Sequence, residues 1–213
     1  MKRFSGKKGH SRGILEALLD RVRGREQLLV RAGDDRPLLL ISFPRGARAA
    51  AEELERAWAH ALRRLSARTL APYSNVFEKL PAIVVVLLNP FNPCECLGHH
   101  HPHGAESRLT RRLEADLGED IGEIDLAYEG IRAWRPTPLS TLAADALGLR
   151  VEAIHFQAAL LAVLLHELEH LVFPNESEHD IRLRSNAFYA AAMEELVREE
   201  SGAGYGMASP PRP

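Results

Sequence analysis

The chain has 213 residues, a length that suits a single domain with a hydrophobic core of its own. Hydrophobic residues make up 46% and charged residues 26% of it, the composition of an ordinary soluble domain. The formal net charge of -2 argues against an overall electrostatic attraction to nucleic acid or membranes. We therefore expect no membrane partner, and no nucleic-acid contact beyond a weak one through the N-terminal arm.

The two ends of the chain differ in composition from its middle. Residues 1–12 carry several Lys and Arg side chains and little that a core would bury, which predicts a disordered basic arm. Residues 201–213 are rich in Gly, Ser and Pro and predict a flexible tail, which leaves one domain over residues 13–200. No secretory signal is recognisable, and the longest apolar run, Ala158–Leu165, is too short to cross a bilayer. A cytoplasmic location is therefore expected.

Between the two ends, the spacing of hydrophobic residues changes several times. Apolar residues recur at helical spacing in some stretches, whereas others are short, β-branched runs bounded by turn residues. This succession of helices and strands predicts an α+β fold, with a small sheet backed by helices. In chain order we predict a helix at 13–23, a β-hairpin at 27–30 and 37–43, an amphipathic helix at 47–65, a buried strand at 82–88, a helix at 105–117, a strand in the first half of 121–131, a short helix at 140–147, and long helices at 152–173 and 176–199.

The strongest functional signal is the segment His166-Glu167-Leu168-Glu169-His170, within the first long helix. Histidines at i and i+4 share one helix face, so both imidazoles can bind one ion. A catalytic Zn²⁺ takes three protein ligands and leaves one position for water, and Glu167 follows the first histidine, where it can act as the general base. Burying these polar side chains in an apolar helix is costly without a partner, which favours a metal site over core histidines.

This segment resembles the active-site helix of the zincin metallopeptidases. The resemblance implies a zincin-like α+β fold: a small mixed β-sheet backed by helices, with an active-site helix and an antiparallel C-terminal helix. It also implies a zinc-dependent hydrolase that cleaves a peptide bond in a protein or peptide substrate. His166 and His170 would bind the zinc, and Glu167 would be the catalytic base. Glu169 departs from the family pattern, which prefers uncharged residues at that position.

The third zinc ligand is expected on the second long helix. The short connection at Pro174 predicts an antiparallel helix pair, and a rise of about 1.5 Å per residue places Glu178 and its neighbours at the height of the two histidines. Glu178 is the first choice, as a glutamate-type third ligand, and His179 is the second. A helix-capping role for Glu178 is the alternative. Arg182 and Tyr189 are candidates for binding a substrate carboxylate or supporting an oxyanion.

A second concentration of metal-binding residue types follows the buried strand: Cys94, Cys96, His99, His101 and His103. Thiols and imidazoles suit zinc or copper, so one prediction is a second, structural metal ion. The alternatives are a loop that reaches the catalytic zinc and a loop that binds no specific metal. We expect no disulfide between the two cysteines, because they are one residue apart and the bond would close a strained ring.

Two other functions are compatible with these residues. Cys96 together with the His166 motif also resembles the peptide deformylases, which use an upstream cysteine as third ligand, but the glycine-rich first motif of that family is missing. A deformylase-like amide hydrolase is therefore a minor alternative. The main alternative is a non-catalytic metal-binding regulatory or interaction protein on a zincin scaffold. An open coordination position would favour the enzyme, and a closed set of four ligands would favour the binding protein.

Overall fold

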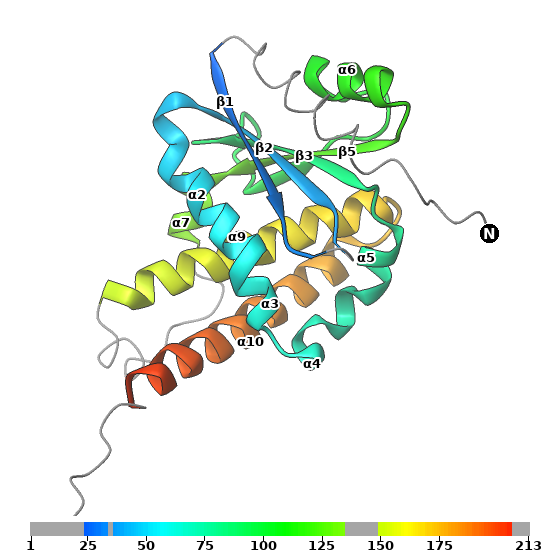
Figure 1. The fold of residues 1–213 in the computed structure, drawn as a ribbon. Coiled ribbons are helices and arrows are strands. Elements are labelled where there is room, and N and C mark those ends of the chain that lie inside the picture. The colour runs from blue at the N-terminus through cyan, green and yellow to red at the C-terminus, as the bar shows by residue number, and fades with distance from the viewer. Residues whose placement is uncertain (1–23, 34–35, 135–148, 206–213) are drawn as a thin grey trace, which may run out of the picture.

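A computed structural model describes residues 24–33, 36–134 and 149–205, which form a five-stranded sheet with helices on both of its faces (Figure 1). The α+β class predicted from the sequence is confirmed. The basic arm at 1–12 and the predicted helices at 13–23 and 140–147 lie outside the described residues.

The sheet is mixed, with strand order β1-β2-β3-β5-β4. Its three inner strands, β2, β3 and β5, run parallel, and the edge strands β1 and β4 are antiparallel to their neighbours. The predicted hairpin and both predicted strands are confirmed, whereas the short strand β4 lies in a segment that we expected to be a loop. The strands are β1 Arg25–Arg31, β2 Leu38–Pro44, β3 Ile83–Asn89, β4 Gly98–His100 and β5 Ile121–Ala127.

The helices largely follow the predicted order. The predicted helix at 47–65 is a continuous helical stretch with one π turn, and it buries Trp58 completely. A further short helix, α7, occupies the second half of the segment 121–131. The helices are η1 Arg45–Ala47, α2 Arg48–Arg56, η2 Ala57–Ala61, α3 Leu62–Arg64, α4 Ala67–Leu70, η3 Ala71–Tyr73, α5 Ser74–Lys79, α6 Arg108–Leu117, α7 Tyr128–Ala133, α9 Leu149–Val172 and α10 Glu178–Tyr205.

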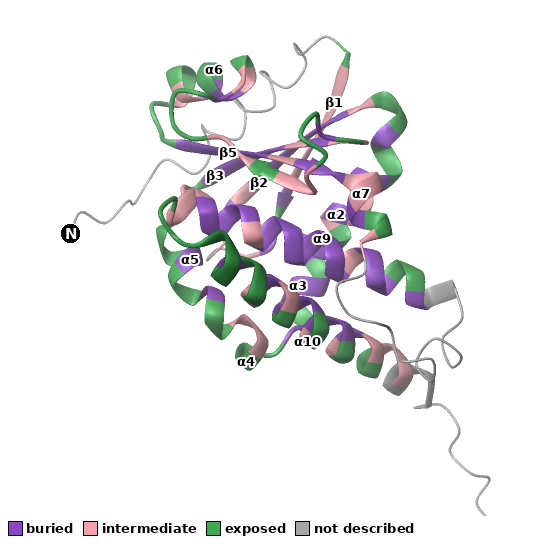
Figure 2. Cartoon of the chain, turned by 180° about the vertical axis from the view of Figure 1, so that it is seen from behind, coloured by how far each residue is buried: buried purple, intermediate pink, exposed green. Residues whose placement is uncertain are grey.

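Helix α9 is the central helix of the main hydrophobic core (Figure 2). It lies between α10 and the sheet, where alternate residues of β3, such as Val84 and Val86, face the same core. The segment Val151–Val172 is long and apolar enough to cross a membrane, but 78% of its most apolar window is buried inside the protein. Its apolar composition is therefore accounted for by its place in the core.

Helix α10 returns antiparallel along α9 and contacts it closely (Figure 1). It begins at Glu178, slightly later than the sequence predicts. It also continues through Tyr205, into the segment for which the Gly- and Ser-rich composition predicts a flexible tail. Residues 206–213 lie outside the described part of the chain.

The opposite face of the sheet carries α6, which is anchored by one buried carboxylate. Leu113 of α6 packs in a second, smaller core with Val85 and Ile121. Ser107 caps the helix, because its hydroxyl accepts a hydrogen bond from the Thr110 N–H. Glu123 of β5, fully buried, accepts hydrogen bonds from the Ser107 N–H at 2.8 Å and from the hydroxyls of Ser107 and Thr110.

Replacing Glu123 with alanine should therefore destabilise the fold. Its hydrogen-bond donors would lose their acceptor in a buried environment, which costs about 2–3 kcal/mol in the free energy of unfolding. Chemical denaturation measures this change. Glu119→Ala, at an exposed position just after α6, is the matched control and should change stability by less than about 0.5 kcal/mol. Equal stability of the two variants would contradict the anchoring role of Glu123.

Candidate metal centre

Three potential ligands meet where α9 and α10 join: His166, His170 and Glu178. Each offers one ligand atom, and the three atoms lie within 4.8 Å of one another. Oε2 of Glu178 is 2.8 Å from Nε2 of His170 and 3.5 Å from Nε2 of His166. A tetrahedral zinc with bonds of about 2.0 Å separates its ligand atoms by about 3.3 Å. The two imidazoles and the carboxylate are therefore close to the spacing and the chemistry that Zn²⁺ requires.

The turn between the helices brings Glu178 to this position. The Phe173 N–H donates to the carbonyl of Glu169 as α9 ends, and the Glu176 N–H donates to the carbonyl of Phe173 within the turn. Helix α10 begins at Glu178, so this residue stands in its first turn. The neighbouring His179 is exposed. In the described part of the chain it makes no hydrogen bond or ion pair with His166 or His170, unlike Glu178.

The environment of His166 favours the form of imidazole that binds metals. Burial lowers its pKa, an effect that the nearby carboxylates of Glu167 and Glu178 only partly offset. The neutral ring is therefore favoured at neutral pH, which leaves a nitrogen lone pair available for a metal. Its Nδ1 lies 3.4 Å from the hydroxyl of Ser185 on α10, so its Nε2 faces Glu178.

Glu169, the residue that departs from the zincin pattern, lies away from the three ligand atoms. Its side chain is buried and forms a 2.7 Å ion pair with Arg184 of α10, which also pairs with Glu176 at 2.6 Å. Burial raises the pKa of Glu169, and the Arg184 guanidinium opposes that rise. Glu169 therefore joins α9 to α10 beside the candidate site.

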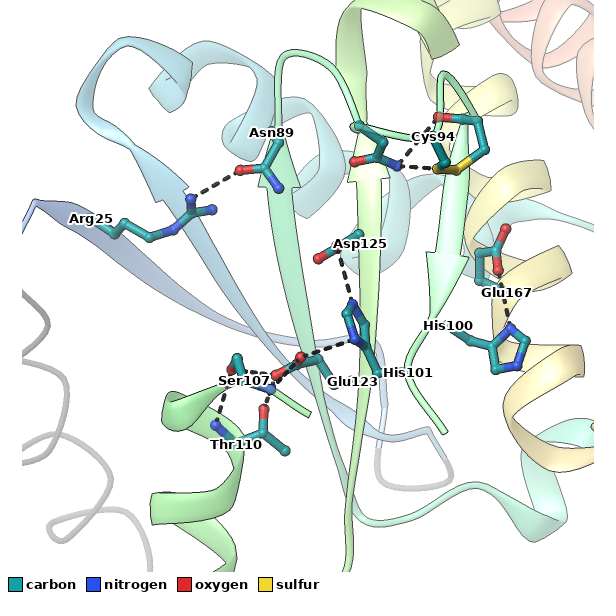
Figure 3. A network of polar contacts seen from close by, with 12 residues as sticks. Arg25, Asn89, Cys94, His100, His101, Ser107, Thr110, Glu123, Asp125 and Glu167 are labelled. Atoms are coloured by element: carbon teal, nitrogen blue, oxygen red, sulfur yellow. Dashed lines mark hydrogen bonds and ion pairs between the residues drawn. A yellow bond between two sulfur atoms is a disulfide. The ribbon is translucent and has the colours of Figure 1, made fainter. Parts of the chain in front are cut away.

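Glu167 is buried against the backbone of β4. A Cβ atom at Gly98 would lie 2.6 Å from both Cγ and Oε1 of Glu167, so this close approach requires glycine. His100, two residues along the strand, places its Nδ1 3.8 Å from Oε2 of Glu167 (Figure 3). Its ring also stacks on that of His170, with centroids 5.1 Å apart.

His100 belongs to the cysteine–histidine loop, but the sequence did not link it to His170 or Glu167. The signal was present, because side chains alternate between the two faces of a strand. Once the segment is a strand, His100 lies on the same face as Gly98, beside Glu167, whereas His101 reaches Asp125 of β5. Recognising this required β4, which the sequence pattern did not predict.

His101, just after β4, lies on the face of the sheet that carries α6, where it contacts two carboxylates of β5 (Figure 3). Its Nε2 is 3.1 Å from Oδ2 of Asp125, and its Nδ1 is 3.8 Å from Oε1 of Glu123. Burial raises the pKa of Asp125, and the hydrogen bond and charge of His101 oppose the rise. These contacts hold the end of β4, and so help to fix His100 on the opposite face.

Cys94 and Cys96 form a disulfide, contrary to the prediction from their spacing. Glu95 adopts a left-handed backbone conformation with φ of +58°, and the two Cα atoms are 5.2 Å apart. This separation lies within the range of about 4.4–6.8 Å that disulfides occupy. With the sulfur atoms bonded to each other, a metal site or a deformylase-like site built on a free thiolate would require the reduced protein.

Two further predicted site residues lie in different surroundings. Arg182 is exposed and lines the cavity above the three candidate ligands. Tyr189 is buried instead, with its hydroxyl 2.6 Å from Nδ1 of His155 and its ring against Trp134. His155 is itself fully buried, so this pair belongs to the core between α9 and α10.

A cavity of about 590 Å³ opens over the candidate site. Its lining includes His166, Glu167, His170 and Glu178, together with the disulfide and β4. No protein-family model matches this chain, and neither a curated protein nor a solved structure matches it. What the site can do chemically is therefore inferred from its own residues and their geometry.

The disulfide predicts a simple thiol count. Protein purified without reductant and then denatured should show no reactive thiol, because the chain has only two cysteines and they pair with each other. Treatment with a dithiol reductant should release both, as measured with a chromogenic thiol reagent. Two free thiols in the unreduced protein would contradict the pairing.

Proposed function

We propose that this protein is a zinc-dependent hydrolase that cleaves a peptide bond, with Glu167 as general base. The observation that carries the proposal is the position of the Glu167 carboxylate. It is buried on the same helix as two histidines that, with Glu178, form a group able to hold zinc, and it lines the same cavity. The mixed sheet with α9 beneath it and an antiparallel α10 agrees with the fold that the resemblance to zincins implies.

His166, His170 and Glu178 are the residues that would hold the zinc. When bound there, zinc would supply Lewis acidity toward a water molecule and a substrate carbonyl. Three protein ligands leave a tetrahedral ion one open position, and the cavity gives access to it. This favours the hydrolase over a non-catalytic metal-binding protein.

Glu167 would move the proton in this reaction. As a carboxylate it accepts a proton from the attacking water, and it then donates that proton to the departing amine. His100, 3.8 Å from the Glu167 carboxylate, faces the same cavity. Its imidazole can donate a hydrogen bond to the oxygen on which negative charge develops.

The edge strand β4 supports a peptide as the substrate. Within the described sheet β4 pairs only with β5, so no strand of that sheet covers its other edge, to which a peptide strand could add. Gly98 and His100 of this strand line the cavity, so an extended peptide along β4 would pass the candidate ligands. Arg182, on the α10 side of the cavity, offers a guanidinium to a substrate carboxylate.

Two substitutions separate the base from the ligand. Glu167→Gln keeps the size of the side chain but removes its basicity, so the protein should retain zinc while cleavage of a quenched fluorescent peptide library falls by about 10²- to 10⁴-fold. Glu178→Ala should instead weaken zinc binding itself. Metal analysis and peptide cleavage are measured on both variants.

Glu176→Ala is the matched control, because Glu176 precedes α10 but pairs with Arg184 outside the candidate site. It should keep both zinc and activity. If Glu167→Gln cleaves peptides at the parental rate, the proposed base is wrong. If a cellular function survives Glu167→Gln but is lost with His170→Ala, the protein is a metal-binding module and not a hydrolase.

A further inference from the structure

A second group of metal-binding side chains lies beside α6, on the opposite face of the sheet from α9. His103, Glu106 and Glu114 each offer one ligand atom, and these atoms lie within 4.8 Å of one another. The sequence alone groups His103 with the cysteines and the other loop histidines. The structure places it with two glutamates that no sequence pattern connected to it.

The loop between β4 and α6 fixes the first two of these residues. The Ala105 N–H donates to the carbonyl of Pro102 at 2.9 Å, which closes a four-residue turn. Gly104 has a φ of +93°, in the left-handed region that favours glycine, and its N–H donates to the carboxylate of Glu106 at 2.8 Å. Within this turn, Nδ1 of His103 comes to 3.2 Å from Oε1 of Glu106.

Glu106 is a buried carboxylate that backbone N–H groups stabilise, without a Lys or Arg ion pair in the described structure. Its side chain is 4% exposed, and in the described structure it has no Lys or Arg within ion-pair distance; its partner is His103, which is 85% exposed. Burial raises the pKa of Glu106, but hydrogen bonds from its own N–H and that of Gly104 outweigh this effect, and the pKa is lowered. Arg111 acts on it only from a longer distance.

Glu114 adds a second carboxylate to the same place. It projects from α6, and its Oε1 lies 3.4 Å from the Ile121 N–H, at the start of β5. Two carboxylates held this close repel each other unless one binds a proton or a cation lies between them. An imidazole beside them supplies a nitrogen ligand, which Mg²⁺ and Ca²⁺ do not favour but Zn²⁺ does.

We propose that His103, Glu106 and Glu114 bind a divalent transition-metal cation, for which Zn²⁺ is the probe. The cation joins the loop after β4 to the middle of α6, and its positive charge offsets the two carboxylates. One nitrogen and two oxygen ligands leave room for water, as in sites that hold an ion without enclosing it. This site is independent of the proposed hydrolase site.

The test uses full-length protein carrying His166→Ala and His170→Ala, so that the other candidate site cannot contribute. After treatment with a chelator and dialysis, this protein should bind about one equivalent of Zn²⁺ by isothermal titration calorimetry. Adding His103→Ala should weaken that binding by about 100-fold or more. His103 is exposed, so its loss should leave the circular dichroism spectrum and the melting temperature of the metal-free protein unchanged.

A second readout localises the ion. Zn²⁺ should slow hydrogen exchange in residues 102–117 of the double variant, and His103→Ala should abolish that protection. His60→Ala, an exposed histidine of η2, is the control and should leave Zn²⁺ binding unchanged.

Three outcomes would overturn the proposal. The first is a double variant that binds no Zn²⁺. The second is unchanged binding after His103→Ala. The third is a Zn²⁺ binding that is lost when Cys94→Ser and Cys96→Ser are combined but is kept in His103→Ala. That result would assign the ion to the cysteine loop. None of these results bears on the hydrolase site, which the double variant lacks.

Discussion

The packing of α9 between β4 and α10 is the constraint on which the rest of the site depends. From the sheet side, the backbone at Gly98 comes so close that a Cβ there would lie 2.6 Å from Glu167 and would displace its side chain. From the other side, the tight turn after α9 brings Glu178 within 2.8 Å of His170. The carboxylate and the imidazoles of one helix are therefore positioned by two different neighbours, and a shift of α9 relative to either would separate Glu167 from Glu178.

Buried carboxylates recur around this packing, and each has a distinct means of stabilisation. Glu169 pairs with Arg184, and Glu123 accepts hydrogen bonds from the start of α6. Glu106 is stabilised by backbone N–H groups. In the part of the chain that the structure describes, Glu167 forms a longer ion-pair contact with the imidazole of His100, at 3.8 Å. A buried charge costs free energy unless it is paired or hydrogen-bonded, and Glu167 has the longest of these contacts, on the side that faces the cavity.

Local sequence patterns predicted the helices and strands that depend on interactions between residues close together in the chain. Helical spacing identified α9 and α10, a run of β-branched residues identified β3, and the rise per residue placed Glu178 at the height of the two histidines. The flexible tail predicted from residue 201 onward begins too early, because α10 continues through Tyr205 despite the glycines in this segment.

The remaining features depend on contacts between distant segments. β4 has only three residues, and it is defined by its pairing with β5 and not by any hydrophobic alternation of its own. Without that strand, His100 could not be placed beside Glu167 and His170, nor His103 assigned to Glu106 and Glu114. The disulfide was missed because spacing alone does not reveal that Glu95 adopts a left-handed conformation.

The most direct test of the central claim is to locate the metal in crystals of the protein grown with Zn²⁺. An anomalous difference map at the zinc absorption edge should show a peak within bonding distance, about 2.0–2.2 Å, of Nε2 of His166, Nε2 of His170 and a carboxylate oxygen of Glu178. Glu167 should lie beside that peak without binding it. Absence of a peak between α9 and α10, or a zinc there enclosed by four protein ligands, would contradict the account.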